Sequence, residues 1–408
     1  MHVQVVIFFV ASPLIGAAAR NKLGVPAGGL GLLQMILGVN GIRLVGKRSG
    51  VGRCIEALLN CIADLDHPFQ EFRVYSPAPI ADDVVLPSCA RNIVLASSLP
   101  LGLWEQFTLM RAHGPNDLLF CPSYVTPILA QCPTFLIHHG SYEGYPQAFS
   151  WWALNKARLA YSLSANRATV VCTVSEHSKR EMIRFYIMKP DRIHVVPEGV
   201  DTRIFRPLQD LQSLIKWRVK TFGSDTPYIV YVGKPVERRN LSALIKAFSL
   251  MKRNEKLPQK LLIVGSDLAG ASPFRRVIAT EGLTKDVVVL GYVNYQEMPL
   301  VYNSADLLIY PSSYEGFGMP VLEAMACGTP AIALNNTSFP EFAAGVAHLL
   351  ANAEVATLQQ GIETVLSDAS LRQRMSEEGP KRAAHYDWRI IARRYLDLML
   401  PVLNTAPD

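Results

Sequence analysis

The sequence is poor in charged residues and in paired cysteines, and both absences narrow the class of protein. Only 18% of the 408 residues are Asp, Glu, Lys or Arg, whereas 50% are hydrophobic, so the chain can bury large cores and is not disordered. Seven scattered cysteines without a CxxC spacing argue against a disulfide framework or a structural zinc site and fit a reducing cytosol. The chain also lacks repeats and low-complexity tracts, so its length predicts two or three ordinary domains, at roughly 150 residues each.

The formal net charge of +6 is a mild basic excess. It permits attraction to phosphate-bearing substrates or to anionic lipid without demonstrating either. We expect no nucleic-acid partner, and nothing in the sequence predicts an oligomeric state.

Residues 1–34 form an apolar extension with three open interpretations. The run Val3–Ala19 is uncharged, but it is short for a membrane span and is interrupted by a proline and a glycine. Only His2 precedes it, where a secretory signal carries positive charge. The extension is therefore a segment outside the fold, a weak membrane anchor or a signal peptide. If it spans a membrane, the basic residues after it place the folded part in the cytoplasm. We expect the folded part to begin at Met35, a second candidate for the start of translation.

Short apolar runs alternate with helical stretches along the rest of the chain. Such alternation predicts parallel sheets covered by helices. We therefore predict an α/β protein with two doubly wound, Rossmann-like domains, at 35–206 and 207–385, followed by an amphipathic terminal helix at 386–408. The predicted strands are Ile36–Asn40, Phe72–Tyr75, Ile93–Ala96, Leu118–Phe120, Thr134–Ile137, Val170–Val174, Tyr228–Val232, Leu261–Val264, Val287–Val293, Leu307–Tyr310, Pro330–Ala333 and Ala347–Leu350.

One stretch, residues 306–333, combines the features of a ligand site. The run Leu307–Tyr310 predicts a buried strand, and Pro320 fits the first turn of the next helix because its φ is already helical. Free N–H groups and partial positive charge at a helix start suit a phosphate. Glu323 lies in this helix, and Glu315 lies in the loop before it. Because a phosphate would repel a carboxylate, we expect Glu323 to accept hydrogen bonds from hydroxyls, such as those of a ribose.

The segment EGFGMPVLEAMACGTPAIA resembles the Glu–seven residues–Glu motif of the retaining glycosyltransferases of family 4, which have the GT-B fold. The resemblance extends from Met35 to about Leu403 and implies two domains that face a cleft, with the terminal helix packed back on the first. It implies that Glu315 orients the transferred sugar and that Glu323 holds the ribose of the donor. The donor contacts that it implies in this loop are Gly316, Phe317, and the amides at Gly318 and Met319. Other matching residues are Pro320, Ala324 and Gly328.

Two further loops resemble donor-binding turns of the family. Arg238 and Arg239 precede a helix that we expect Asn240 to cap, and a guanidinium matches phosphate oxygens bidentately. The resemblance to a G-x4-R-K-N loop implies that both arginines bind the donor diphosphate, although a solvated basic pair would fit the residues alone. The string GKRSGVGR resembles a G-x-G-R loop that faces the donor phosphates. We therefore expect Gly50 and Gly52 at the phosphates, with a plain strand-to-helix turn as the alternative.

Two adjacent histidines follow the predicted strand Thr134–Ile137, at the sheet edge where parallel sheets bind ligands. The family has a His-Asp pair here. The resemblance implies that His138 contacts the transferred sugar, while His139 replaces the Asp and its role stays open. Glu198, in a later matching segment, stands where the family more often has Asn.

Two other patterns are weaker. Asp64–Asp66 spells the DxD string that binds metal in the other main glycosyltransferase fold, but it ends a helix before a proline, and we expect no metal there. Five aromatic residues could line an acceptor groove, although core packing or a surface helix fits them better; they are Tyr142, Tyr145, Phe149, Trp151 and Trp152.

The resemblance implies a retaining transfer of a hexose from a nucleotide diphosphate sugar to a glycan or lipid-linked acceptor, without metal or other cofactor. The motif is similar to that of bacterial mannosyltransferases of polysaccharide and O-antigen assembly, so GDP-mannose is the first expected donor and UDP-glucose the second. We expect a cytoplasmic protein, and a lipid-linked acceptor would fit contact with the inner face of the plasma membrane. A nucleotide-sugar epimerase and a non-catalytic nucleotide-sugar-binding subunit are the alternatives.

Overall fold

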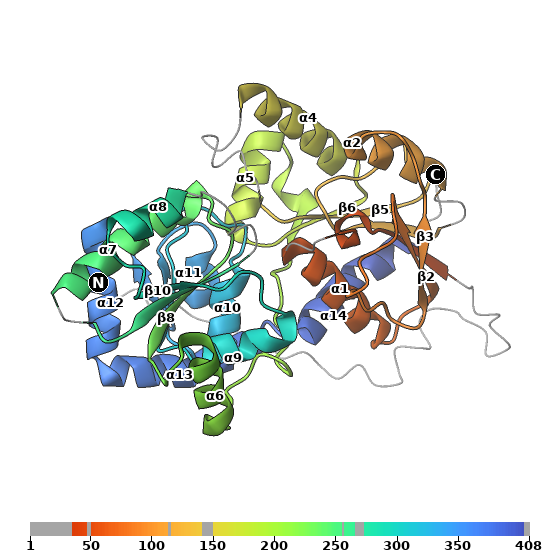
Figure 1. Cartoon of the computed structure of the whole chain (residues 1–408). Helices are drawn as coiled ribbons and strands as arrows, with labels where there is room; N and C mark the ends of the chain where they lie inside the picture. Colours follow the sequence, from red (N-terminus) through yellow and green to blue (C-terminus); the bar gives the residue numbers. More distant parts are fainter. Residues whose placement is uncertain are drawn as a thin grey trace, which may run out of the picture. The chain divides into compact units, whose positions relative to one another are not determined.

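The computed structural model describes residues 35–46, 50–112, 116–140, 150–254, 257–265 and 273–403. The expected extension at 1–34 and the aromatic residues Tyr142, Tyr145 and Phe149 lie outside these residues. Contacts join Met35–Asp408 into one unit, shown in Figure 1.

Seven described strands form the first sheet, in the order β3-β2-β1-β4-β5-β6-β7 with every pairing parallel. The order reverses between β1 and β4, which is where such sheets open a crevice for a ligand. Parallel neighbours need crossover connections, and α1 (Gly50–Ala63), α4 (Trp151–Arg167) and α5 (Glu176–Tyr186) supply three of them. The strands are β1 (Met35–Asn40), β2 (Phe69–Ser76), β3 (Ala90–Val94), β4 (Leu118–Cys121), β5 (Thr134–His138), β6 (Val170–Thr173) and β7 (Ile193–Val195).

Six described strands form the second sheet, which is again parallel, in the order β10-β9-β8-β11-β12-β13. Its order reverses between β8 and β11. The strands are β8 (Tyr228–Val232), β9 (Lys260–Val264), β10 (Val287–Val289), β11 (Leu307–Tyr310), β12 (Ala331–Leu334) and β13 (His348–Leu350). The helices are α6 (Leu211–Phe222), α7 (Leu241–Arg253), α8 (Pro273–Thr280), α9 (Met298–Asn303), α10 (Met319–Ala326), α11 (Phe339–Ala343), α12 (Val355–Ser367) and α13 (Ala369–Ala384).

The two sheets confirm the predicted α/β fold class. Every residue of β4, β5, β6, β11 and β12 is buried, because helices cover both faces of a parallel sheet. That burial explains why these strands were visible as short apolar runs. The bounds of some strands differ from the prediction. The strand expected at Ile93–Ala96 lies at Ala90–Val94, and the strand expected at Val287–Val293 ends at Val289.

The last helix, α14 (Trp388–Leu403), contacts the first sheet although it follows the second in sequence. It lies along α1, as Figure 1 shows. The Tyr395 hydroxyl donates to the Val196 carbonyl at 3.2 Å, and the Tyr395 ring meets Phe135 edge-on. The domain bounds at 206 and 385 stay a prediction. Among the described residues, no helix combines the length and the apolar character that a membrane crossing requires.

Candidate active site

A pocket of about 450 Å³ lies where strands of the second sheet end and where α1 begins. Residues after β8, β9 and β11 line it from the second sheet, and the start of α1 lines it from the first. This position is the crevice outside the carboxyl ends of parallel strands, where ligands of open α/β sheets bind. The loop 315–320 forms one wall, so the stretch singled out in the sequence lies at the pocket.

The wall at 315–320 leads into the N-terminus of α10. Gly318 precedes this helix with φ 112°, a conformation that favours glycine, and a Cβ there would come within 2.5 Å of the Phe339 ring. Pro320 lies in the first turn, as predicted. First-turn amides have no acceptor within their own helix, so this end of α10 offers donors and partial positive charge to an anion.

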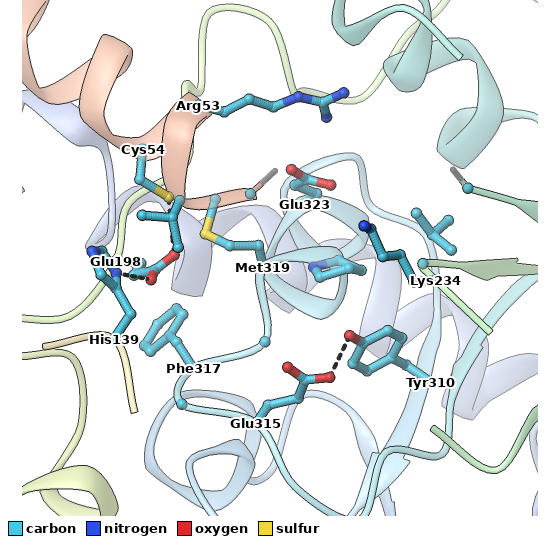
Figure 2. Close-up of a pocket in the computed structure, with 18 of the residues that line it drawn as sticks. Arg53, Cys54, His139, Glu198, Lys234, Tyr310, Glu315, Phe317, Met319 and Glu323 are labelled. Atoms are coloured by element: carbon cyan, nitrogen blue, oxygen red, sulfur yellow. Dashed lines mark hydrogen bonds and ion pairs between the residues drawn. The ribbon is translucent and has the colours of Figure 1, made fainter. Parts of the chain in front are cut away.

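Glu315 accepts hydrogen bonds from both predicted phosphate-binding arginines. Its Oε1 lies 2.6 Å from Arg238 Nη1 and 2.8 Å from Arg239 Nε, and the hydroxyls of Tyr310 and Ser312 donate to the same oxygen at 2.8 and 3.0 Å (Figure 2 shows the Tyr310 bond). Burial alone would raise the pKa of Glu315, but the charges of Arg239 and Arg238 outweigh it and lower this pKa to about 2. Glu315 is therefore an anion at neutral pH.

The loop that carries the arginines is tied to the Glu315 loop. Asn240 lies at the N-terminal boundary of α7 with φ 51°, but its side chain does not cap that helix as expected. Its Nδ2 instead donates to the Pro311 carbonyl at 2.8 Å and to Ser313 Oγ at 2.7 Å. The Ser313 amide also donates to the Arg238 carbonyl at 2.7 Å. The left-handed backbone, which Asn tolerates better than most residues, turns its side chain toward the neighbouring loop.

Glu323 faces the pocket from α10, and its carboxyl has a pKa near neutral pH. Its Oε2 accepts from the Tyr302 hydroxyl at 2.6 Å. Burial raises the pKa of Glu323 to about 7, against the hydrogen bond from Tyr302 and the charge of Arg53. In Figure 2, Arg53 extends from α1 above Glu323. A carboxyl in this state can accept hydrogen bonds from ligand hydroxyls or donate one.

The structure brings His139, and not His138, to the pocket, which corrects the expected assignment. The His138 side chain is fully buried, with Nε2 3.1 Å from the Tyr186 hydroxyl. Burial, with His139 beside it, lowers the pKa of His138 to about 3, so it stays neutral. His139 lines the pocket, with Nδ1 2.8 Å from Glu198 Oε1. Neighbouring residues at a strand end point to opposite sides, so only one of the two could face the ligand crevice.

The glycine turn contributes differently from the expectation. Gly50 begins α1 and lines the pocket, whereas Gly52 is buried in the helix and does not line it. Two basic residues that we did not predict, Arg53 and Lys234, also line the pocket. Arg53 places its guanidinium 5.4 and 5.2 Å from the ring centroids of Tyr292 and Tyr295, and Lys234 lines the pocket after β8. The only signal for Arg53 was its place at the end of GVGR.

Contacts from α5 hold the Glu315 loop against the first sheet. Ser175 Oγ donates to the Gly316 carbonyl at 2.8 Å, and the Tyr314 hydroxyl donates to Glu181. The Glu341 carboxylate accepts from the first two amides of α5, each at 2.8 Å. At Gly316, a Cβ would overlap the His139 carbonyl oxygen, so this position needs glycine for close approach.

Other predicted features lie away from the pocket. Asp64 and Asp66 are exposed beyond the end of α1. Trp151 and Trp152 begin α4 and are exposed, as the surface-helix alternative expected. Within the part of the chain that the structure describes, no group of three or more His, Cys, Asp or Glu side chains is arranged to hold a metal ion.

Two parallel sheets border a pocket with a helix N-terminus, an arginine pair and two carboxyls, which is the architecture of the GT-B fold. Residues 48–204 match the family model described as Glycosyltransferase Family 4, and residues 215–382 match Glycosyl transferases group 1. The chain belongs to the glycosyltransferases that carry these two domains. The predicted family is therefore confirmed.

Relatives with named activities are similar over part of their length. The chain is 30% identical to O-antigen chain mannosyltransferase B of Escherichia coli over 228 residues, which is 55% of this chain and 58% of the relative. It is 26% identical to MMP alpha-(1->4)-mannosyltransferase of Mycolicibacterium hassiacum over 60% of this chain and 58% of the relative. The chain thus spans little more than half of each.

Solved structures agree on the fold. Sucrose-phosphate synthase of Thermosynechococcus elongatus superposes with a TM-score of 0.75 at 20% identity, covering 91% of this chain and 100% of the other. Anabaena HepE in complex with UDP-glucose gives 0.73 at 19% identity, covering 90% and 99%. At such identities the likeness shows the fold alone.

Proposed function

We propose that this protein transfers a hexose, with retention, from a nucleoside diphosphate sugar to a hydroxyl of a glycan or lipid-linked acceptor in polysaccharide synthesis. The observation that carries the proposal is the cluster of Glu315, Arg238 and Arg239 beside the start of α10. It combines an anion to orient sugar hydroxyls with cations and amides for a diphosphate. Residues 35–206 would then serve the acceptor and 207–385 the donor.

The proposed chemistry breaks the bond between the anomeric carbon and the β-phosphate oxygen and forms a bond from that carbon to the acceptor oxygen. The acceptor proton leaves with the nucleoside diphosphate. Negative charge grows on the β-phosphate, and preorganised donors lower the barrier. The bonds to Glu315 use only part of the five N–H groups of each guanidinium, so both arginines retain donors for phosphate. This arrangement needs no divalent metal.

Four other residues complete the proposed site. Glu323 accepts hydrogen bonds from the ribose hydroxyls, and His139 takes the contact with the transferred sugar that we first expected of His138. The amides at Gly318 and Met319 complete the phosphate site. Closure of the first sheet over the donor would exclude water and limit hydrolysis.

Mannose is the favoured sugar because the chain is similar to two mannosyltransferases. GDP-mannose is therefore the first donor to test. UDP-glucose is the second, since the structural neighbour HepE was crystallised with it. We place the protein at the cytoplasmic face of the membrane, where its net charge of +6 would favour anionic lipid.

The test is thermal unfolding of the full chain against a panel of nucleotide sugars, with and without EDTA, followed by an assay for transfer to acceptor glycans. We expect one donor to raise the unfolding temperature regardless of EDTA, and the R238A variant to lose this rise. Conversion of the donor without an acceptor would instead indicate an epimerase. Donor binding without any turnover, restored by an active partner, would indicate a binding subunit.

A further inference from the structure

The helix α4 exposes apolar side chains on the side that faces away from the protein. Trp152, Leu159 and Leu163 are exposed and repeat at helical spacing, so they share one outward stripe. The buried residues of this helix are Ser164 and Ala165, on the opposite side. A surface helix usually shows mainly polar residues outward, whereas here the apolar stripe lies among the exposed polar side chains of Asn155, Lys156 and Arg158.

The N-terminal end of α4 carries two exposed tryptophans. Trp151 is 65% exposed and Trp152 is 78% exposed, and their rings meet edge to face at 4.6 Å between centroids. Tryptophan combines a large apolar ring with a polar N–H, which suits the boundary between hydrocarbon and water. Leaving two neighbouring tryptophan rings exposed to water is unfavourable in free energy.

A neighbouring residue adds to the same surface. Ile187 follows α5 with φ 54°, a conformation that β-branched residues rarely adopt, and its side chain is 85% exposed. Ser162 and Asn166 of α4 both donate to the Tyr186 carbonyl, so Ile187 is anchored beside the apolar stripe. Leu129 is also exposed, and it follows Ile128, whose carbonyl accepts from Arg167 of α4. We call this set the α4 face: Trp151, Trp152, Leu159, Leu163, Ile187 and Leu129.

The basic residues of α4 favour an anionic partner for the α4 face. The helix Trp151–Arg167 contains Lys156, Arg158 and Arg167 and no acidic residue. Two copies of the chain packed face to face by a two-fold axis would bring these like charges together. An anionic surface would instead be attracted, and exposed tryptophan rings beside basic side chains suit the headgroup region of a bilayer.

We propose that the α4 face is a membrane-docking surface that inserts its tryptophans at the headgroup level of an anionic lipid bilayer. The inference rests on the proposed function, because docking would bring the pocket to a lipid-linked acceptor. Figure 1 shows α4 running over α5. Glu181 of α5 accepts a hydrogen bond from the hydroxyl of Tyr314, the residue before Glu315. The docked face is therefore one helix away from the donor site.

Vesicle flotation of the full chain tests the proposal, with phosphatidylcholine vesicles alone or mixed with phosphatidylglycerol. We expect the wild type to float with the anionic vesicles and the double variant W151S/W152S to bind them about tenfold more weakly. L211S is the matched control, because Leu211 is equally exposed at the start of α6, and it should float like the wild type. Residues 1–34 are present in every variant, so a difference between variants belongs to the α4 face.

Two outcomes would overturn the proposal. One is unchanged flotation of W151S/W152S, which would assign lipid binding to another part of the chain. The other is a dimer in sedimentation velocity that the double variant disrupts, which would make the face a contact between copies. The donor-induced rise in unfolding temperature should be equal in the wild type and W151S/W152S, which shows that the variant folds. If no donor stabilises either protein, the proposed function fails while the flotation result stands.

Discussion

Replacing Glu315 with Gln removes the negative charge between Arg238 and Arg239, and the structure sets the size of the effect. The pKa of Glu315 falls from its ordinary value of 4.5 to about 2 in the folded protein. A lowering of this size corresponds to about 3 kcal/mol of stability. Because the folded pKa is the lower one, this stability is fully present above pH 4.5 and is lost as the pH falls toward 2. We therefore expect E315Q to lower the free energy of unfolding at neutral pH by up to about 3 kcal/mol.

Urea unfolding of the wild type and E315Q, followed by circular dichroism over a series of pH values, measures this difference. It should be largest at neutral pH and should shrink as the pH falls below 4.5. E354Q is the control, since Glu354 is exposed and its side chain caps no helix, and it should change stability by less than about 0.5 kcal/mol. A difference between wild type and E315Q that stays constant with pH would refute the electrostatic reasoning, because lost packing does not titrate.

The same substitution should separate donor binding from transfer. Without the carboxylate, the arginines have more N–H groups for phosphate, so E315Q should bind the nucleoside diphosphate at least as tightly as the wild type. Transfer should fall by about a hundredfold, because the sugar loses the anion that orients it. Titration calorimetry and turnover assays measure the two quantities. Parallel losses in both would show that Glu315 acts only by holding the arginines in place.

Four further substitutions, E323Q, E341Q, H139A and H138F, test other parts of the structure. Donor affinity should strengthen as the pH rises through about 7, because Glu323 ionises there and then accepts hydrogen bonds from the ribose. Calorimetry should find that the affinity of E323Q does not depend on pH in this way. A pH profile shared by both proteins would exclude Glu323 as its source. E341Q should lower the free energy of unfolding, measured in urea, by about 1 kcal/mol, because the Glu341 carboxylate accepts from two amides at the start of α5. A change as small as that of E354Q would contradict this capping role. In steady-state assays, H139A should reduce turnover by about tenfold or more while H138F leaves it nearly unchanged, and the reverse order would restore our first assignment.

The strands of both sheets could be predicted from the sequence because the sheets are parallel and buried. A strand covered on both faces is a short, continuous apolar run, and β8 and β11 were predicted with the bounds that the structure gives. One helix start was also marked, by Pro320 in the first turn of α10. These signals are local, so no knowledge of the fold was needed to find them.

Much of the site depended on long-range geometry. Arg238 meets Glu315 across 77 residues of sequence, so the motifs named both residues but not their ion pair. The choice between His138 and His139 depends on which side chain faces the crevice where β5 ends, and a one-residue change reverses it. Arg53 follows the glycine turn, and only the folded chain brings Tyr292 and Tyr295 beside it.

The position of α14 bears on how the chain is made. The ribosome releases the described strands of the first sheet before the second begins, yet the helix that covers Phe135 and bonds to Val196 is synthesised only after the second sheet. At usual translation speeds, the first sheet waits on the order of 10–40 s for this helix. During that time its apolar surface is a binding site for chaperones and a start point for aggregation. A chain cut before Trp388 would keep that surface uncovered permanently and would also remove Trp388 from the lining of the pocket. We therefore expect C-terminal truncation to reduce soluble yield.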